Sequence, residues 1–187
     1  LVDLMHTGFG ALPTEDDAIV RTVGEQFVLS MVARIFKPGE QVDTMLVLVG
    51  KQGAKKSTAL RTLVGDDWYG STDLDLANKD SYMQLRGKLL YELAEFHSVK
   101  RVEASKAKSW LTNEKDSYRA PYARRSEDHK RQTVMAGTTN EDEFLMDPTG
   151  WRRYRPVTVG STDLVWIAAA REQLFAEAVV RYKAGET

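Results

Sequence analysis

The feature that most constrains this chain is an apolar run that passes directly into a glycine-containing loop and then into a helical pattern. The apolar run covers residues 45–49, and residues 50–58 read Gly-Lys-Gln-Gly-Ala-Lys-Lys-Ser-Thr. A buried strand that ends in such a loop and opens a helix brings backbone N–H groups, an ammonium and a hydroxyl to one point. We therefore predict a strand, a phosphate-binding loop and a helix in that order.

The loop matches the spacing G-x-x-x-x-G-K-[ST] at Gly50, Lys56 and Ser57, but Lys55 stands where a second glycine is usual. We expect Lys56 to reach the β- and γ-phosphates and the Ser57 hydroxyl to reach Mg²⁺, so ATP and Mg²⁺ are the predicted cofactors. Lys55 places a side chain in a tight turn and adds positive charge, and we expect weaker nucleotide binding as a result. The predicted nucleotide-binding residues are Gly50, Gln52, Gly53, Ala54, Lys55, Lys56, Ser57 and Thr58.

Periodicity along the rest of the chain predicts strands that alternate with helices, which is typical of an α/β fold built on a mainly parallel sheet of five strands. Helices are expected over 16–36, 56–64, 78–86, 99–111 and 162–182. Strands are expected over 45–49, from 68, over 88–93, 132–137 and 151–159, with a hairpin or long loop over 112–130. We divide the chain into an N-terminal helical segment, 1–40, that packs on a core of residues 41–187.

Composition limits the possible partners and compartments. The 187 residues carry a net charge of -1, so any contact with nucleic acid must come from a local basic patch. The absence of cysteine excludes disulfides and thiolate metal sites and fits a cytoplasmic protein. The apolar runs are too short to span a membrane, so no membrane partner is expected. Because the chain begins with Leu1, we expect it to be a piece of a longer protein.

Polar residues follow two of the predicted strands. Glu92 closes the run 88–93, and Glu95 comes three residues later. A carboxylate beside the phosphate loop can hold the Mg²⁺ shell or polarise an attacking water. Asn140 follows the strand 132–137, and its amide can orient that water because it both donates and accepts. The alternatives are surface acids and a loop-capping asparagine.

Arg152 and Arg153 follow a predicted turn, and a guanidinium suits the charge on a transferring phosphoryl group. The pair is equally compatible with an ordinary exposed surface. If one of the two arginines acts on a neighbouring subunit, the active species must be an oligomer.

A dense basic stretch interleaved with aromatic residues precedes the strand over 132–137. Cations follow nucleic-acid phosphates and a tyrosine offers a stacking face for unpaired bases, although solvated basic loops are also common. The predicted DNA-binding residues are Arg119, Tyr122, Arg124, Arg125 and Lys130.

Several motifs in a fixed order carry a resemblance that covers nearly the whole chain. They are the run 42–48 into the loop, Glu-Leu-Ala-Glu at 92–95, Tyr-Arg-Ala-Pro-Tyr at 118–122, Gly-Thr-Thr-Asn-Glu at 137–141 and Asp-Pro-Thr-Gly-Trp-Arg-Arg at 147–153. In these motifs the chain resembles the virulence-associated E family, which comprises phage, plasmid and mobile-island proteins similar to superfamily-three helicases.

The resemblance implies a three-layer α/β/α P-loop NTPase core of the AAA+-like type. Such a core would assemble as a homo-oligomeric ring, for example a hexamer, and move along single-stranded or forked DNA during replication of a mobile element. It implies metal binding at Ser57 and Glu92. The catalytic positions would be Glu92, Glu95, Asn140, and Arg152 or Arg153 as the arginine finger.

Three positions depart from the family pattern: Lys55 replaces a glycine, Trp151 a small polar residue and Arg155 an aromatic one. The acid pair is also split, because Leu93 follows Glu92. The leading hypothesis is an ATP-dependent helicase motor. The alternatives are a degenerate P-loop domain that binds DNA or partner subunits with little or no hydrolysis, and a P-loop phosphotransferase.

Overall fold

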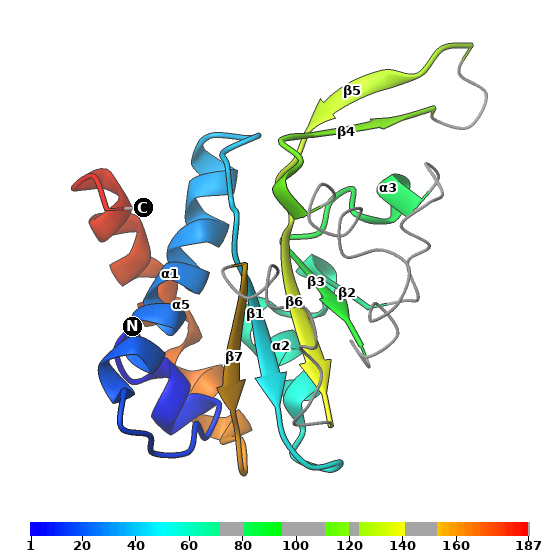
Figure 1. Cartoon of the computed structure of the whole chain (residues 1–187). Helices are drawn as coiled ribbons and strands as arrows, with labels where there is room; N and C mark the ends of the chain where they lie inside the picture. The colour runs from blue at the N-terminus through cyan, green and yellow to red at the C-terminus, as the bar shows by residue number, and fades with distance from the viewer. Residues whose placement is uncertain (72–80, 95–110, 120–123, 141–152, 187) are drawn as a thin grey trace.

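The fold is built on one parallel sheet, shown in Figure 1 with its strands pointing downward. The computed structural model describes residues 1–71, 81–94, 111–119, 124–140 and 153–186. The strand order is β2-β3-β6-β1-β7, and every neighbouring pair is parallel. In that order the strands are β2 (Tyr69–Ser71), β3 (Leu90–Leu93), β6 (Val134–Thr139), β1 (Met45–Val49) and β7 (Tyr154–Thr158). The predicted five-stranded parallel sheet is thus confirmed.

Three helices cover one face of the sheet (Figure 1). They are α1 (Asp17–Phe36), α2 (Lys56–Val64) and α5 (Leu164–Lys183), each within two residues of its predicted bounds. Gly65 ends α2 with φ +86°, as expected for a glycine at a helix end. The helix α3 (Ser81–Gln84) ends two residues before the predicted end at 86, and a turn with Gly87 at φ +75° follows it. Residues 78–80 of the predicted helix lie outside the described residues. The helix expected over 99–111 lies outside the described residues except for its last position.

Both faces of the central strands are buried, which explains why their sequences are continuously apolar rather than alternating. On β1, Leu46 and Leu48 pack in the larger cluster with the helices, whereas Met45, Val47 and Val49 pack in a second cluster on the opposite face. The second cluster also contains residues from β3, β6 and β7 and the side chains that cover them. Those additional residues are Leu85, Tyr91, Leu93, Leu111, Met135 and Tyr154.

The first residues of the chain pack against the same core. A π-helical turn, η1 (Leu4–Gly8), contributes Leu4 and Met5 to the larger cluster, and Ala11 forms an isolated antiparallel bridge with Val159. The division of the chain into segments 1–40 and 41–187 stays a prediction.

A two-stranded antiparallel hairpin projects from the amino-terminal end of the sheet, where Figure 1 shows it extending beyond the body. Its strands are β4 (Lys115–Tyr118) and β5 (Glu127–Lys130), in register from Lys115 opposite Lys130 to Tyr118 opposite Glu127. The sequence left open a hairpin or a long loop over 112–130, and the structure shows a hairpin. β5 continues through three residues into β6.

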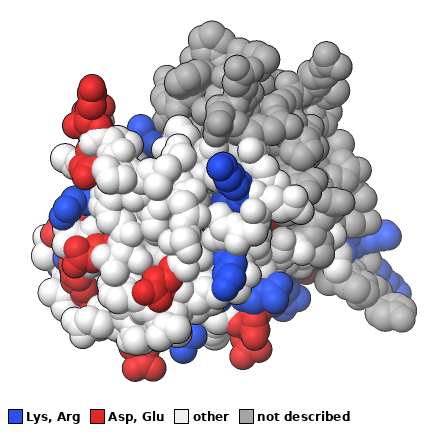
Figure 2. Space-filling view, turned by 90° about the horizontal axis from the view of Figure 1, so that it is seen from below, with Lys and Arg blue, Asp and Glu red and all other residues white. Residues whose placement is uncertain are grey.

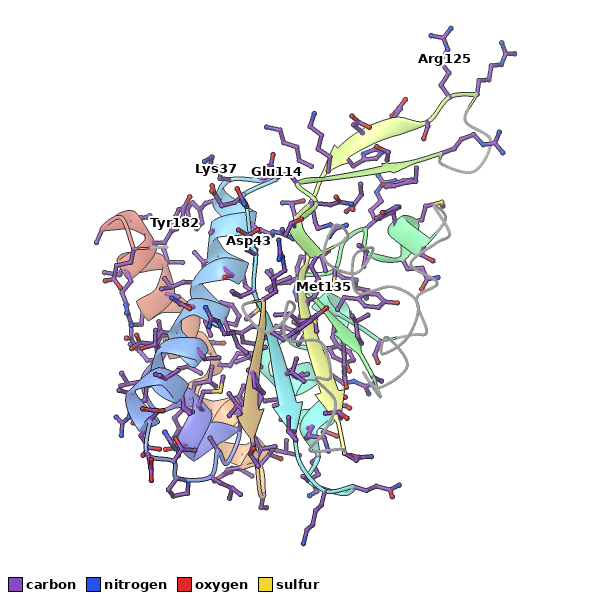
Figure 3. All side chains as sticks on the ribbon, viewed as in Figure 1. Lys37, Asp43, Glu114, Arg125, Met135 and Tyr182 are labelled. Atoms are coloured by element: carbon purple, nitrogen blue, oxygen red, sulfur yellow. The ribbon has the colours of Figure 1, made fainter. Side chains whose placement is uncertain are left out.

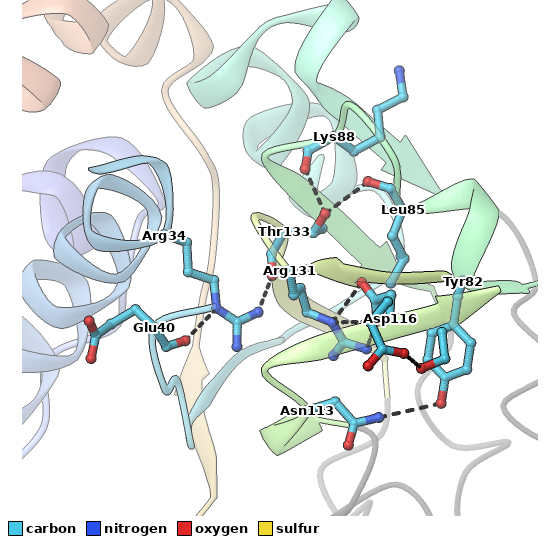
Figure 4. A network of polar contacts seen from close by, with 11 residues as sticks. Arg34, Glu40, Tyr82, Leu85, Lys88, Asn113, Asp116, Arg131 and Thr133 are labelled. Carbon is cyan, nitrogen blue, oxygen red and sulfur yellow. Dashed lines mark hydrogen bonds and ion pairs between the residues drawn. The ribbon is translucent and has the colours of Figure 1, made fainter. Parts of the chain in front are cut away.

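Polar contacts made by two buried arginines, Arg131 and Arg34, hold the root of this hairpin (Figure 4). The Arg131 Nε donates to both carboxylate oxygens of Asp116, at 2.9 and 3.1 Å. Arg34, on α1, donates to the Thr133 carbonyl and at 3.1 Å to the Glu40 carbonyl. Burial, and then the neighbouring Arg131 charge, lower the pKa of Arg34 to about 10. The hairpin is therefore held to α1 and to the start of β6.

Candidate functional site

The loop between β1 and α2 requires glycine at its start for a steric reason. A Cβ atom on Gly50 would lie 2.4 Å from the Val159 carbonyl oxygen, which belongs to backbone and cannot easily move. Gly53 requires glycine for a different reason, because its φ of +88° is a conformation that other residues rarely adopt. The loop therefore passes close to the end of β7 and then turns into the helix.

Lys55 occupies the residue position just before α2 with a left-handed backbone, φ 59° and ψ 29°. It is the one non-glycine residue with positive φ in the described part of the chain. Its side chain is exposed and lines a cavity. It therefore does not crowd the turn, which differs from the expectation. The cost of this lysine is backbone strain rather than crowding within the loop.

Lys56 points back across the loop from the first residue of α2. Its Nζ donates to the Gly50 carbonyl at 2.6 Å, to the Lys51 carbonyl at 3.1 Å and to Asn140 Oδ1 at 2.8 Å. Burial lowers the pKa of Lys56, while the charge of Glu92 acts in the opposite direction. The ammonium thus connects the loop to the end of β6.

Glu92 lies fully buried at the end of β3 and accepts three hydroxyl hydrogen bonds. Its Oε1 accepts from Ser57 Oγ at 2.6 Å and from Thr138 Oγ1 at 2.5 Å. Its Oε2 accepts from the Tyr69 hydroxyl on β2. Burial first, and then this hydrogen bond, raise the pKa of Tyr69, so the phenol is kept as a donor. The carboxylate is therefore held in one orientation behind Ser57.

These contacts leave Ser57 suited to a cation. Because its proton points to Glu92, the lone pairs of the hydroxyl oxygen are available on the other side. No group of three or more His, Cys, Asp or Glu side chains that could hold a metal occurs in the described part of the chain. Any Mg²⁺ at Ser57 would consequently need oxygen ligands from phosphates and water, as is usual for that ion.

A cavity of about 330 Å³ opens beside the loop, at the carboxyl edge of the sheet. No side chain caps the start of α2 among the described residues, so its first N–H groups are available to an anion. Figure 2 views the molecule from this edge and shows basic side chains on it. The cavity is lined by Gln52, Gly53, Lys55, Lys56, Ser57, Thr58, Ala94, Thr138, Thr139 and Asn140. These groups fit a polyphosphate with a bound cation.

The structure brings together predicted residues from three separate segments of the chain: Lys56 and Ser57 at the start of α2, Glu92 on β3 and Asn140 after β6. Arg153 lies elsewhere, just before β7 and therefore at the amino edge of the sheet, opposite the loop of its own chain. Three further predicted site residues lie outside the described residues: Glu95, Tyr122 and Arg152.

Sequence reasoning missed two hydroxyl groups that hold Glu92, those of Tyr69 and Thr138. The predicted strand 132–137 placed Thr138 next to a strand end, but nothing in the sequence indicated which carboxylate its hydroxyl would contact. Tyr69 was expected only as a residue of a short strand. Its partner becomes evident once β2 is known to lie beside β3.

The predicted DNA-binding residues that the structure describes, all but Tyr122, lie on the hairpin strands or directly beside them. Arg119, Arg124 and Arg125 are exposed near its end, and Figure 3 shows Arg125 pointing away from the body. Lys130 is exposed nearer the root. The basic tip and the phosphate loop therefore lie at opposite ends of the sheet (Figures 1 and 3).

The sheet order, the glycine-containing loop after β1 and the acid on β3, two strands away from β1, define an α/β P-loop fold of the AAA+-like type. The chain belongs to the virulence-associated protein E-like domain family, whose model matches residues 2–187. No curated protein matches the chain. No helix among the described residues is both long enough and apolar enough to cross a membrane.

Solved structures with a similar fold include apo structures of the NrS-1 C-terminal region. One has 20% sequence identity and a TM-score of 0.56, and the match covers 95% of this chain and 42% of that one. A second apo form has 21% identity and a TM-score of 0.53, and the match covers 89% of this chain and 42% of the other. The chain thus spans less than half of the NrS-1 region, and the similarity concerns the fold.

Proposed function

We propose that this domain is an ATP-dependent DNA helicase motor that acts in the replication of a mobile genetic element. The observation that carries the proposal is the hydrogen-bonded series Asn140–Lys56 and Ser57–Glu92, which joins the loop to the ends of two neighbouring strands. This is the arrangement needed to bind a nucleotide triphosphate and to sense its γ-phosphate. Family membership supports a role in mobile elements.

Each of these residues has a distinct part in the proposal. Lys56 exchanges its loop carbonyls for phosphate oxygens, and the free N–H groups at the start of α2 bind the same anion. Ser57 offers its oxygen to Mg²⁺, which neutralises charge on the phosphates when it is bound. Asn140, already in contact with Lys56, lies where it can orient a water at the γ-phosphate.

Because Glu92 is buried, the proposal assigns metal binding and activation of the attacking water to two different acids. Its side chain is completely buried, and both of its oxygens are occupied by hydroxyl donors. Glu92 is therefore assigned to the metal side of the site, where it acts through Ser57. Polarisation of the attacking water is assigned to Glu95, the second acid of the motif.

The location of Arg153 supports an oligomeric active form. Within one chain Arg153 and the phosphate loop lie at opposite edges of the sheet, so Arg153 does not complete the site of its own chain. The guanidinium of Arg153, or that of Arg152, which precedes it in the sequence, would act on an adjacent subunit in a ring.

The hairpin is the proposed DNA contact. Its exposed tip carries Arg119, Arg124 and Arg125, and an extended ribbon of this kind can follow a phosphate backbone. Its rigid attachment through Arg131 and Asp116 would fix the direction in which the tip projects.

A second candidate is a degenerate P-loop domain that binds DNA or partner subunits without useful hydrolysis. Two observations favour it: the left-handed backbone at Lys55, and the hydrogen bonds that Lys56 makes to its own loop. The left-handed backbone at Lys55 is a conformational strain that glycine would avoid. The hydrogen bonds from Lys56 to its own loop must be broken before Lys56 can bind a phosphate.

To decide between the motor and the degenerate domain, nucleotide binding and DNA-stimulated ATP hydrolysis are measured over a range of protein concentrations. The proteins compared are the parent chain, Lys55→Gly and Lys56→Ala. The motor proposal expects DNA-stimulated turnover in the parent and its loss in Lys56→Ala. Turnover in Lys55→Gly but not in the parent supports the degenerate form. If neither the parent nor Lys55→Gly binds nucleotide at any concentration, the motor proposal is wrong.

A further inference from the structure

Tyr69 stands out among the buried polar groups because it belongs to no motif yet touches the central acid of the site. It is the first residue of the edge strand β2, and its hydroxyl donates to Glu92 Oε2. Its ring packs in the larger core cluster, and the guanidinium carbon of Arg61 lies 5.1 Å from the ring centroid. The ring is thus fixed from both the sheet and α2.

The two oxygens of Glu92 are divided between different partners. Oε1 accepts hydrogen bonds from the hydroxyls of Ser57 and Thr138, whereas Oε2 accepts one from the hydroxyl of Tyr69. A carboxylate whose second oxygen lost its donor would be a buried, partly unsatisfied charge, and it would rotate toward the remaining donors. Such a rotation would change the direction of the Ser57 proton, and with it the direction of the oxygen lone pairs that face the cavity.

We propose that Tyr69 is a positioning residue for the cation site, which orients Glu92 so that the Ser57 oxygen faces the bound metal. This inference rests on the proposed function, since it concerns the same phosphate loop. Partners that orient a metal ligand from behind affect metal affinity even though they do not touch the metal. Backbone pairing places Tyr69 opposite Leu90 and Ser71 opposite Glu92, so the pairing of β2 with β3 fixes the position of Tyr69 beside the site.

The test compares Tyr69→Phe with the parent chain and with a matched control, Tyr91→Phe. Tyr91 is also a buried tyrosine, adjacent to Glu92 on β3, but its hydroxyl contacts Gln84 Oε1 at 3.0 Å and its ring packs in the second cluster. Both substitutions remove one phenolic oxygen and keep the ring. They differ in whether the lost hydroxyl holds the carboxylate.

Binding of Mn²⁺, followed by electron paramagnetic resonance, is measured in the presence of a non-hydrolysable ATP analogue. Binding of the same analogue without metal is measured separately by calorimetry. We expect Tyr69→Phe to weaken Mn²⁺ binding about tenfold, in the range found for residues that orient metal ligands. The metal-free analogue should bind the parent and Tyr69→Phe within about twofold, because the backbone N–H groups and Lys56 are unchanged. Tyr91→Phe should match the parent in both measurements.

The possible failures are distinguishable. If the parent binds the analogue and Mn²⁺ but Tyr69→Phe binds Mn²⁺ equally well, the inference is wrong and the proposed function stands. If Tyr69→Phe and Tyr91→Phe lose Mn²⁺ affinity equally, or if Tyr69→Phe loses the metal-free analogue to the same degree, Tyr69 has only a structural role and the inference is again overturned. If the parent binds neither probe, both the proposed function and this inference fail.

Discussion

Replacing Lys55 by glycine should make the chain more stable, even though it removes a residue from the centre of the proposed site. Lys55 has φ 59° and ψ 29°, a left-handed conformation in which a Cβ atom lies too close to the following carbonyl. This conformation costs an L-residue roughly 1–2 kcal/mol, and glycine avoids the cost. Glycine in turn loses about 0.5–1 kcal/mol more conformational entropy on folding.

The difference leaves a net gain of about 0.5–1 kcal/mol for Lys55→Gly, from the same backbone costs. In a chain of this size that gain corresponds to a rise in Tm of roughly 1–4 °C. Lys55→Ala is the matched control, because it removes the same charge and leaves the left-handed residue with a Cβ atom. It should therefore be no more stable than the parent.

Urea unfolding and thermal melting of the three proteins measure the effect directly. The ordering expected is glycine above both alanine and lysine. If Lys55→Ala gains as much stability as Lys55→Gly, removal of the charge accounts for the effect and the backbone explanation is refuted.

Three further predictions concern other parts of the molecule. Gly50→Ala should destabilise the chain by about 1–3 kcal/mol in urea unfolding, because the new methyl group would meet the backbone at the end of β7; a loss below a few tenths would contradict the close approach. The pKa of Glu40 is lowered, first by its hydrogen bond to Lys37, so this carboxylate adds stability above the ordinary glutamate pKa and loses it as the pH falls through the lowered value. Nuclear magnetic resonance titration should accordingly give Glu40 a midpoint below 4.5 that rises in Lys37→Ala, and an unchanged midpoint would show that the pair does not form in solution. Arg124→Ala combined with Arg125→Ala should weaken binding to single-stranded DNA and reduce the slope of log K against log salt by about 1.5; an unchanged affinity and slope would remove the hairpin tip from the DNA contact.

The parts of the site that follow strand ends could be predicted from sequence. The runs 45–49 and 132–137 and the acid at 92 mark where strands of a parallel sheet end, and parallel strands that run side by side end at the same edge. Lys56 and Asn140 were therefore expected near each other before their 2.8 Å contact was known.

The other features of the site and the fold depend on contacts between segments that are distant in the sequence. Nothing near Tyr69 indicates that its strand lies beside β3, so its hydrogen bond to Glu92 required the sheet order. Arg34, Asp116 and Arg131 were not expected in the interior, because charged residues are rarely buried unless they are paired. Arg131 lies 15 positions from Asp116, and Arg34 lies 99 positions from Thr133, whose carbonyl it contacts. The sequence cannot show such pairs, whereas the structure joins them at the hairpin root.

The strand β6 has a consequence for how changes in the molecule would be transmitted. Residues 131–133 connect the hairpin to β6, and β6 ends next to Asn140, which contacts Lys56. The six residues of β6, roughly 20 Å at the usual rise per residue, therefore form most of the path from the root of the hairpin to the site. Hydrogen bonds to β1 and β3 prevent the strand from stretching or bending freely. A displacement of the hairpin β4–β5 along the direction of β6 would therefore move Asn140 by nearly the same amount.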